Sequence, residues 1–168
     1  MPGWTNVGSG SVPRSRTTTL HANPFFVLGI NTRDDSRKIV ESAEERSLHI
    51  DHDLCHRARS DLTNPRSRLA AELAWMPGVS PSMAEKLTKA LSENPMSVRA
   101  DQSLPVLARA NVMASALELV EEREPATSVA ELIRDFAWVV ESVNPHEVLR
   151  DVNEDRAVSG FPDVPGID

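Results

Sequence analysis

The sequence predicts an all-α protein. Apolar residues recur every three or four positions through most of the chain, which is the spacing that places them on one face of a helix. Asn-Pro dipeptides divide this pattern into segments. Asparagine is a good helix N-cap, and proline suits the first helical position. No stretch alternates apolar and polar residues as a half-buried strand would. The four dipeptides begin at Asn23, Asn64, Asn94 and Asn144.

Four helices are predicted in the N-terminal half. A short helix covers about 24–28 and stops at Gly29, and a longer one covers about 34–50. The third covers about 51–62 and is either separate or joined to the second by a bend. The fourth covers about 65–76. The apolar residues expected on their buried faces are Ile39, Ala43, Ile50, Leu54, Ala58, Leu62, Leu69, Leu73 and Met76.

Four more helices are predicted in the C-terminal half, over about 81–93, 104–122, 128–143 and 145–157. Asn94-Pro95 is expected to end the first of them and to open a loop. The third begins with the capping-box pattern of a serine followed by a glutamate three residues later. The second and third are long, periodic and joined by a short loop, which is typical of an antiparallel hairpin. Their expected buried residues are Leu107, Ala110, Met113, Leu117, Val120, Val129, Leu132, Ile133, Phe136, Val140 and Val143.

Composition divides the chain into four parts. The first residues are rich in Gly, Ser, Thr and Pro, and such a segment cannot bury enough apolar surface to offset its ordering entropy. Near the C-terminus, Gly160 is expected to adopt a left-handed C-cap and Phe161 to fold back against the body. The predicted parts are a flexible arm (1–22), a head (23–76), a C-terminal helical bundle (80–158) and an irregular tail (159–168).

Length and cysteine content define the broad class of protein. A chain of 168 residues can bury a sizeable core without disulfides or metals. The single cysteine, Cys55, excludes an intramolecular disulfide and is typical of a reducing compartment. No apolar run approaches the length of a membrane span, and the N-terminus lacks the layout of a signal peptide. We therefore expect a cytoplasmic protein without a membrane partner.

The charge is concentrated in one region. The formal net charge of −7 argues against general binding to nucleic acid, which requires many Lys and Arg contacts. Residues 118–156 contain eleven acidic and four basic residues, whereas 33–68 contain eight of each. The acidic region is either a solvated helix face or a docking surface for a basic partner.

Catalytic motifs are not found. His52 and His56 are four residues apart, with Cys55 between them, so a metal site or an activated thiol is one alternative. The glutamate of the His-Glu-x-x-His metalloprotease motif is missing, and no second pair of ligands occurs elsewhere. Glycine-rich phosphate loops and the Gly-x-Ser-x-Gly pattern are also missing. We therefore expect no enzyme activity, no metal and no cofactor.

A cluster of arginines flanks the predicted turn near residue 63: Arg57, Arg59, Arg66 and Arg68. These residues are a candidate contact surface for a protein partner. In the alternative interpretation, they form ion pairs with acidic residues of neighbouring helices, namely Glu41, Glu44, Glu45 and Asp61.

Three segments of the head are similar to J-domains. Residues 23–30, Asn-Pro-Phe-Phe-Val-Leu-Gly-Ile, resemble the first short J-domain helix, and 36–39, Ser-Arg-Lys-Ile, resemble the start of the second. Residues 58–69, Ala-Arg-Ser-Asp-Leu-Thr-Asn-Pro-Arg-Ser-Arg-Leu, are similar to the end of the third helix and the start of the fourth. The resemblance covers about 23–76. The His-Pro-Asp signature is absent, and His49-Ile50-Asp51 resembles a remnant of it.

The resemblance implies a non-enzymatic co-chaperone or adaptor that acts through protein–protein contacts, with a DnaK-type chaperone as the implied partner. His49 and Asp51 then become candidate contact residues beside the arginine cluster. A structural or regulatory subunit of a larger complex, with no chaperone link, remains the alternative.

Overall fold

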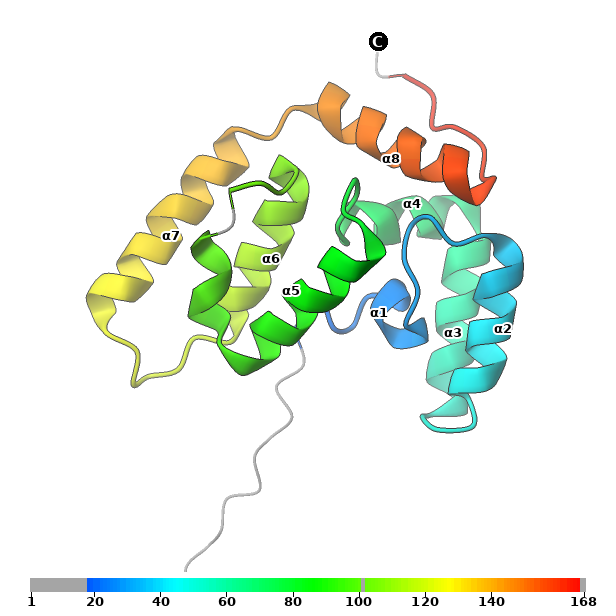
Figure 1. Ribbon diagram of the computed structural model, residues 1–168, viewed down its shortest axis with the longest axis horizontal. Helices are drawn as coiled ribbons and strands as arrows, with labels where there is room; N and C mark the ends of the chain where they lie inside the picture. Colours follow the sequence, from blue (N-terminus) through cyan, green and yellow to red (C-terminus); the bar gives the residue numbers. More distant parts are fainter. Residues whose placement is uncertain (1–17, 101, 167–168) are drawn as a thin grey trace, which may run out of the picture.

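The computed structural model describes residues 18–100 and 102–166, and every regular element in these residues is helical (Figure 1). This confirms the all-α class. The head contains α1 (Pro24–Leu28), α2 (Ser36–Arg46), α3 (His52–Thr63) and α4 (Pro65–Leu73). The C-terminal part contains α5 (Pro81–Glu93), the 3-10 helix η1 (Pro95–Ala100), α6 (Val106–Glu118), α7 (Ala126–Glu141) and α8 (Pro145–Ser159). None of the helices in the described residues is long and apolar enough to span a membrane.

The Asn-Pro dipeptides act at helix ends as predicted. The side-chain oxygens of Asn23, Asn64 and Asn144 accept hydrogen bonds from backbone N–H groups in the first turns of α1, α4 and α8. Each bond satisfies a donor that has no partner inside its helix. Asn94 ends α5, but Pro95 opens a 3-10 helix rather than an irregular loop.

The predicted bounds of four helices are wrong. α4 ends at Leu73 instead of near Met76, and α6 covers Val106–Glu118 instead of about 104–122. α2 ends at Arg46 instead of near Ile50, and a turn at 47–51 separates it from α3. α2 and α3 are therefore two distinct helices, and they pack side by side. α3 starts after Asp51, because the Asp51 carboxylate caps the helix by accepting a hydrogen bond from Leu54 N at 2.8 Å. α7 begins at Ala126, two residues before the predicted capping box, and no side chain caps it.

The core is continuous from the head into the C-terminal helices. One cluster of buried apolar residues includes Phe25 of α1, Leu62 of α3 and Met113 of α6. The rings of Phe25 and Trp75 lie 6.2 Å apart and join α1 to the segment after α4. The head and the bundle therefore share a single hydrophobic core.

Part of the predicted flexible arm is packed. Leu20 is only 1% exposed, and Thr19 donates its backbone N–H to Glu118 of α6 at 2.9 Å. His21 lies edge-on to the ring of Phe26 at 4.8 Å. Residues 18–22 thus belong to the body, which corrects that part of the prediction, while 1–17 lie outside the described residues.

The start of the tail has the predicted conformation, with Gly160 as a left-handed C-cap of α8. Gly160 has a left-handed φ of 76° and ends α8. The backbone N–H of Phe161 then bonds to the carbonyl of Arg156 at 3.2 Å, which turns the chain back toward the body. Asn153 fixes the segment further along, because its side chain bonds to both the N–H and the carbonyl of Val164.

α6 and α7 form the predicted hairpin, side by side and joined by a short loop, with α7 at the edge of the molecule (Figure 1). Arg99 of η1 holds α7 from a second side, because its guanidinium bonds to Glu131 at 2.7 Å and to Asp135 at 2.5 Å. However, Ile133 and Val140, which we expected in the core, are about half exposed.

Candidate functional site

The turn between α2 and α3, which we call the hairpin tip (residues 47–51), presents His49 and Asp51 to solvent. Figure 1 shows it at the end of the head that lies farthest from α8. Asp51 caps α3, so its carboxylate is partly used by the fold. Apolar side chains accompany the two polar ones, since Leu48 is 79% exposed and Ile50 is 38% exposed.

Three of the four predicted arginines lie on the surface. Arg57 and Arg59 project from α3, and Arg66 from the first turn of α4. Within the described part of the chain, none of the three forms an ion pair, so the expected pairing with acids on neighbouring helices is not found for them. Arg66 lies beyond the far end of α3, about 17 Å from the hairpin tip at the helical rise of 1.5 Å per residue.

Arg68 is not a surface residue, and its assignment to the contact surface is wrong. Its side chain is 0% exposed. The guanidinium donates from Nε to Glu72 Oε1 at 2.8 Å and from Nη2 to the carbonyl of Thr32 at 3.2 Å. It also stacks on the ring of Phe161, 3.5 Å from the ring centre. Arg68 therefore joins α4 to the loop before α2 and to the C-terminal tail.

Glu72 is shared between two buried arginines. Its second carboxylate oxygen accepts a hydrogen bond from Arg156 Nε of α8 at 2.9 Å. Arg156 Nη2 also lies 2.7 Å from this oxygen. The two atoms form an ion pair, but their angles do not fit a hydrogen bond. Burial lowers the pKa of the Arg68 guanidinium from its ordinary value, and the charge of Glu72 opposes that shift. We call Arg68, Glu72 and Arg156 the buried charge cluster.

Asp155 joins the same elements through its other neighbours. Its carboxylate accepts from the hydroxyl of Thr32 at 2.6 Å, from Nε of Arg33 at 2.8 Å and from the backbone N–H of Gly78 at 3.0 Å. Its side chain is 1% exposed. Asp155 and the buried charge cluster thus hold α8 against the head, and both were missed because acidic and basic residues usually lie at the surface.

The His52–Cys55–His56 cluster does not converge on one point. Cys55 is 1% exposed and faces the core, whereas both histidines are exposed, with their rings stacked 6.5 Å apart. In the described residues, no group of three or more His, Cys, Asp or Glu side chains has the geometry to hold a metal ion.

The burial of Cys55 predicts its reactivity. We expect the thiol of the folded protein to react with an alkylating reagent far more slowly than a free thiol, because the reagent cannot reach a buried sulfur. Labelling followed by mass spectrometry should become complete only in denaturant. Rapid labelling of the native protein would instead support an exposed, activated thiol and the enzyme alternative.

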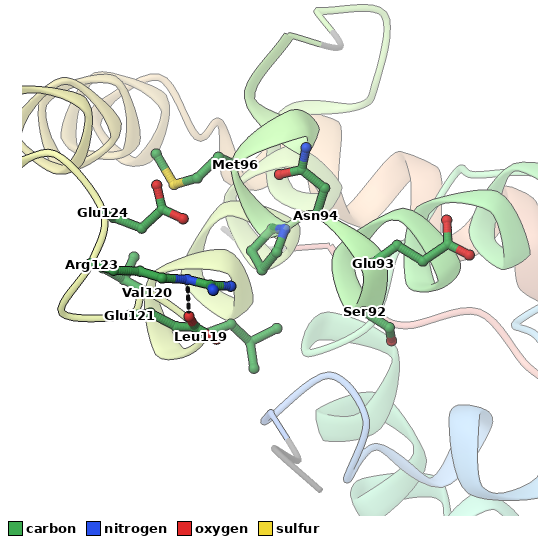
Figure 2. A pocket seen from close by; sticks show the side chains of 10 residues that line it. Ser92, Glu93, Asn94, Met96, Leu119, Val120, Glu121, Arg123 and Glu124 are labelled. Atoms are coloured by element: carbon green, nitrogen blue, oxygen red, sulfur yellow. Dashed lines mark ion pairs between the residues drawn. The ribbon is translucent and has the colours of Figure 1, made fainter. Parts of the chain in front are cut away.

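A hollow with a volume of about 540 Å³ lies where α5 ends and the loop between α6 and α7 passes (Figure 2). Glu93 and Glu124 lie on opposite sides of it, and an ion pair joins Arg123 to Glu121. Its lining contains no histidine or cysteine. None of the predicted site residues lines it, and its groups do not form a nucleophile–base pair.

Comparisons of the chain with protein-family models, with curated proteins and with solved structures give no match.

Proposed function

We propose that the protein is a non-enzymatic adaptor that binds another protein through the hairpin tip, with a DnaK-type chaperone as the partner to test first. One observation carries this proposal. The tripeptide His49-Ile50-Asp51, which resembles the His-Pro-Asp signature, lies in an exposed turn between two packed helices, where Ile50 and the preceding Leu48 face solvent.

The helices beneath the tip make it a firm platform. Ile39 of α2 and Cys55 and Ala58 of α3 are buried between the helices, and α1 packs against α3. The cap that Asp51 places on α3 fixes the chain direction at the end of the turn. A preorganised surface loses little conformational entropy on binding, which favours affinity.

The chemistry of the tip suits a protein partner. Exposed apolar side chains gain from burial in an interface. Arg57 and Arg59, without ion pairs in the described chain, project from the helix that begins at the tip. Arginine is enriched in protein interfaces. The net charge of −7 also argues against nucleic acid as the partner.

A regulatory or structural subunit of a larger complex is the second candidate. Isoleucine replaces the proline of the chaperone-binding signature at Ile50, and three glutamates of α2 (Glu41, Glu44 and Glu45) offset its basic residues. Both departures would weaken recognition by a DnaK-type chaperone. Affinity purification that recovers one stoichiometric partner unrelated to chaperones would favour this candidate.

The test measures ATP hydrolysis by the DnaK-type chaperone of the source organism, with and without this protein. We expect the wild-type chain to stimulate hydrolysis, and His49→Gln to reduce the stimulation about tenfold, which corresponds to about 1.4 kcal/mol of binding free energy. The His49 side chain is exposed and forms no hydrogen bond or ion pair within the described residues, so we expect the substitution to leave the fold intact.

The matched control is His146→Gln, the same change at an exposed histidine of α8. It should stimulate as well as the wild type. If the wild-type chain neither stimulates nor binds the chaperone, the chaperone partner is excluded, and the subunit candidate takes its place.

A further inference from the structure

A second hollow, with a volume of about 440 Å³, lies between the start of α6 and the last turns of α7. Small-molecule sites typically have volumes of about 300–1,000 Å³. Part of the lining is apolar and comes from both sides, with Leu104 and Val106 on one and Val139 on the other. Two further side chains, those of Arg109 and Trp138, give the hollow its chemistry.

Arg109 brings an unpaired charge to this hollow. It lies near the start of α6 and is partly buried. Within residues 18–100 and 102–166, its guanidinium forms neither a hydrogen bond nor an ion pair, and its Nε is buried without a partner. A buried donor of a charged group is costly when it has no acceptor, so such groups are nearly always paired in native proteins.

The other buried arginines show what Arg109 lacks. In the described part of the chain, three buried side-chain nitrogen atoms have no hydrogen-bond partner, one in each of Arg68, Arg109 and Arg156. Arg68 and Arg156 both form ion pairs with the carboxylate of Glu72, so their charges are compensated. Arg109 has no carboxylate of its own, and the hollow beside it has room for one.

Asp135 also lines the hollow, but it does not supply this carboxylate. Its Oδ2 accepts a hydrogen bond from Nε of Arg99 at 2.5 Å, and its Oδ1 lies 3.7 Å from Nε of Arg134. Because two arginines compensate Asp135, it repels an anion in the hollow only weakly. The start of α6, which no side chain caps, adds partial positive charge nearby.

Trp138 gives the hollow an aromatic wall. Its side chain is 63% exposed, whereas tryptophan is highly buried on average. The face of an exposed indole is a favourable surface for another planar ring. The hollow therefore combines one unpaired cation with an aromatic and aliphatic surface.

We propose that this hollow binds a small aromatic carboxylate, whose ring packs on Trp138 and whose carboxylate pairs with Arg109. The planar guanidinium matches a carboxylate, which can accept two parallel N–H···O bonds. One unpaired arginine balances one negative charge, which suits a carboxylate better than a phosphate group with nearly two charges at neutral pH. This site does not depend on the hairpin tip or on its partner.

The experiment titrates the full chain with benzoate and follows two signals by NMR, the indole N–H of Trp138 and the backbone N–H of Val139. Trp138→Phe assigns the indole signal among the three tryptophans. We expect both signals to shift in a saturable way, with a dissociation constant of about 1 mM for so small a ligand. Benzamide, the uncharged analogue of similar shape, should bind at least about tenfold more weakly, because it lacks the charge that Arg109 pairs with.

Two variants test the two halves of the site. Arg109→Gln should weaken benzoate binding at least about tenfold, and it should fold as stably as the wild type, because it removes a partly buried charge that has no partner. Trp138→Ala should also weaken binding, and it should keep the fold, because the indole is mostly exposed. The matched control is Arg57→Gln, the same change at an exposed arginine of α3, which should bind benzoate like the wild type.

Several results would overturn the proposal. One is the absence of a saturable shift in the wild-type chain up to about 10 mM benzoate, ten times the expected constant. Equal binding by Arg109→Gln, or equal binding of benzamide, would show that the arginine does not recognise the ligand. Inorganic phosphate that binds more tightly than benzoate, and that also requires Arg109, would replace the carboxylate with a phosphate ligand.

Discussion

Replacing Glu72 with alanine is expected to lower the free energy of unfolding by about 3–5 kcal/mol. Glu72 is 1% exposed and is the carboxylate that both Arg68 and Arg156 contact. Its removal leaves two like charges buried close together without the anion that compensates them. Globular domains are stable by only about 5–15 kcal/mol, so this change removes a large share of the total.

Urea denaturation followed by circular dichroism measures this loss. The matched control is Glu41→Ala, which also breaks an Arg–Glu pair four residues apart, here with Arg37 at 3.0 Å on the surface. Such exposed pairs contribute at most about 1 kcal/mol. Equal losses for the two variants would contradict the role of the buried charge cluster.

Glu72→Gln is the milder variant for the same site. It keeps the volume and one oxygen acceptor but removes the charge, so its loss should fall between those of Glu41→Ala and Glu72→Ala. Because it leaves no cavity, a sizeable loss would show that the charge, and not the packing, stabilises this contact.

Local signals predicted only some of the helix ends. α1 and α5 have the predicted bounds, because a proline at the first position and a glycine or asparagine after the last fix each end through contacts within a few residues. α7 began early because Pro125 itself can precede a helix, and the capping-box serine became part of the first turn. The sequence therefore predicted that each helix exists, but it predicted the exact bounds only where capping residues define both ends.

Burial was harder to predict than helicity. Leu73 was expected in the core and is 38% exposed, whereas Arg68 on the same helix is fully buried. Periodicity identifies an apolar face, but it cannot show that α8 and the tail, more than 80 residues later, cover the opposite face with Arg156 and Phe161. That contact is tertiary, and no spacing within α4 encodes it.

The same limit applies to α7. Leu132 and Ile133 are neighbours in an apolar helix, and both fit a buried stripe. The position of α6 decides that Leu132 is 0% and Ile133 52% exposed. The turn at the hairpin tip was not predicted either, because Ile50 was expected on the buried face of a longer second helix and is 38% exposed. His49 and Asp51 were named as contact residues only through the resemblance to J-domains.

The acidity of residues 118–156 also has a more specific meaning in the structure. Asp155 and Arg156 belong to this region, but both are buried and bind residues of the head. Others, such as Asp135, pair with Arg99 of η1. Part of the charge that could have served a basic partner therefore holds the fold together instead.

Replacing Asp155 with asparagine is expected to lower the free energy of unfolding by about 2–3 kcal/mol, the range for lost hydrogen bonds to a charged group. The carboxylate accepts bonds on both oxygens, from Thr32 and Gly78 on one and from Arg33 on the other. An amide has only one oxygen, so its NH₂ group must face at least one donor. The loss should concentrate on the contact between α8 and the head.

Limited trypsin digestion separates this local effect from general destabilisation. Arg150 is an exposed cleavage site on α8, which packs against α4. In Asp155→Asn, cleavage after Arg150 should accelerate more than cleavage after Arg57, an exposed arginine of α3. Asp163→Asn, the same change at an exposed residue of the tail, should leave both rates unchanged. A trypsin site within a helix is cleaved only when that helix opens, so the two cleavage rates report on the opening of α8 and of α3 separately. Equal acceleration at the two arginines would mean that Asp155 stabilises the whole fold and has no particular role in holding α8.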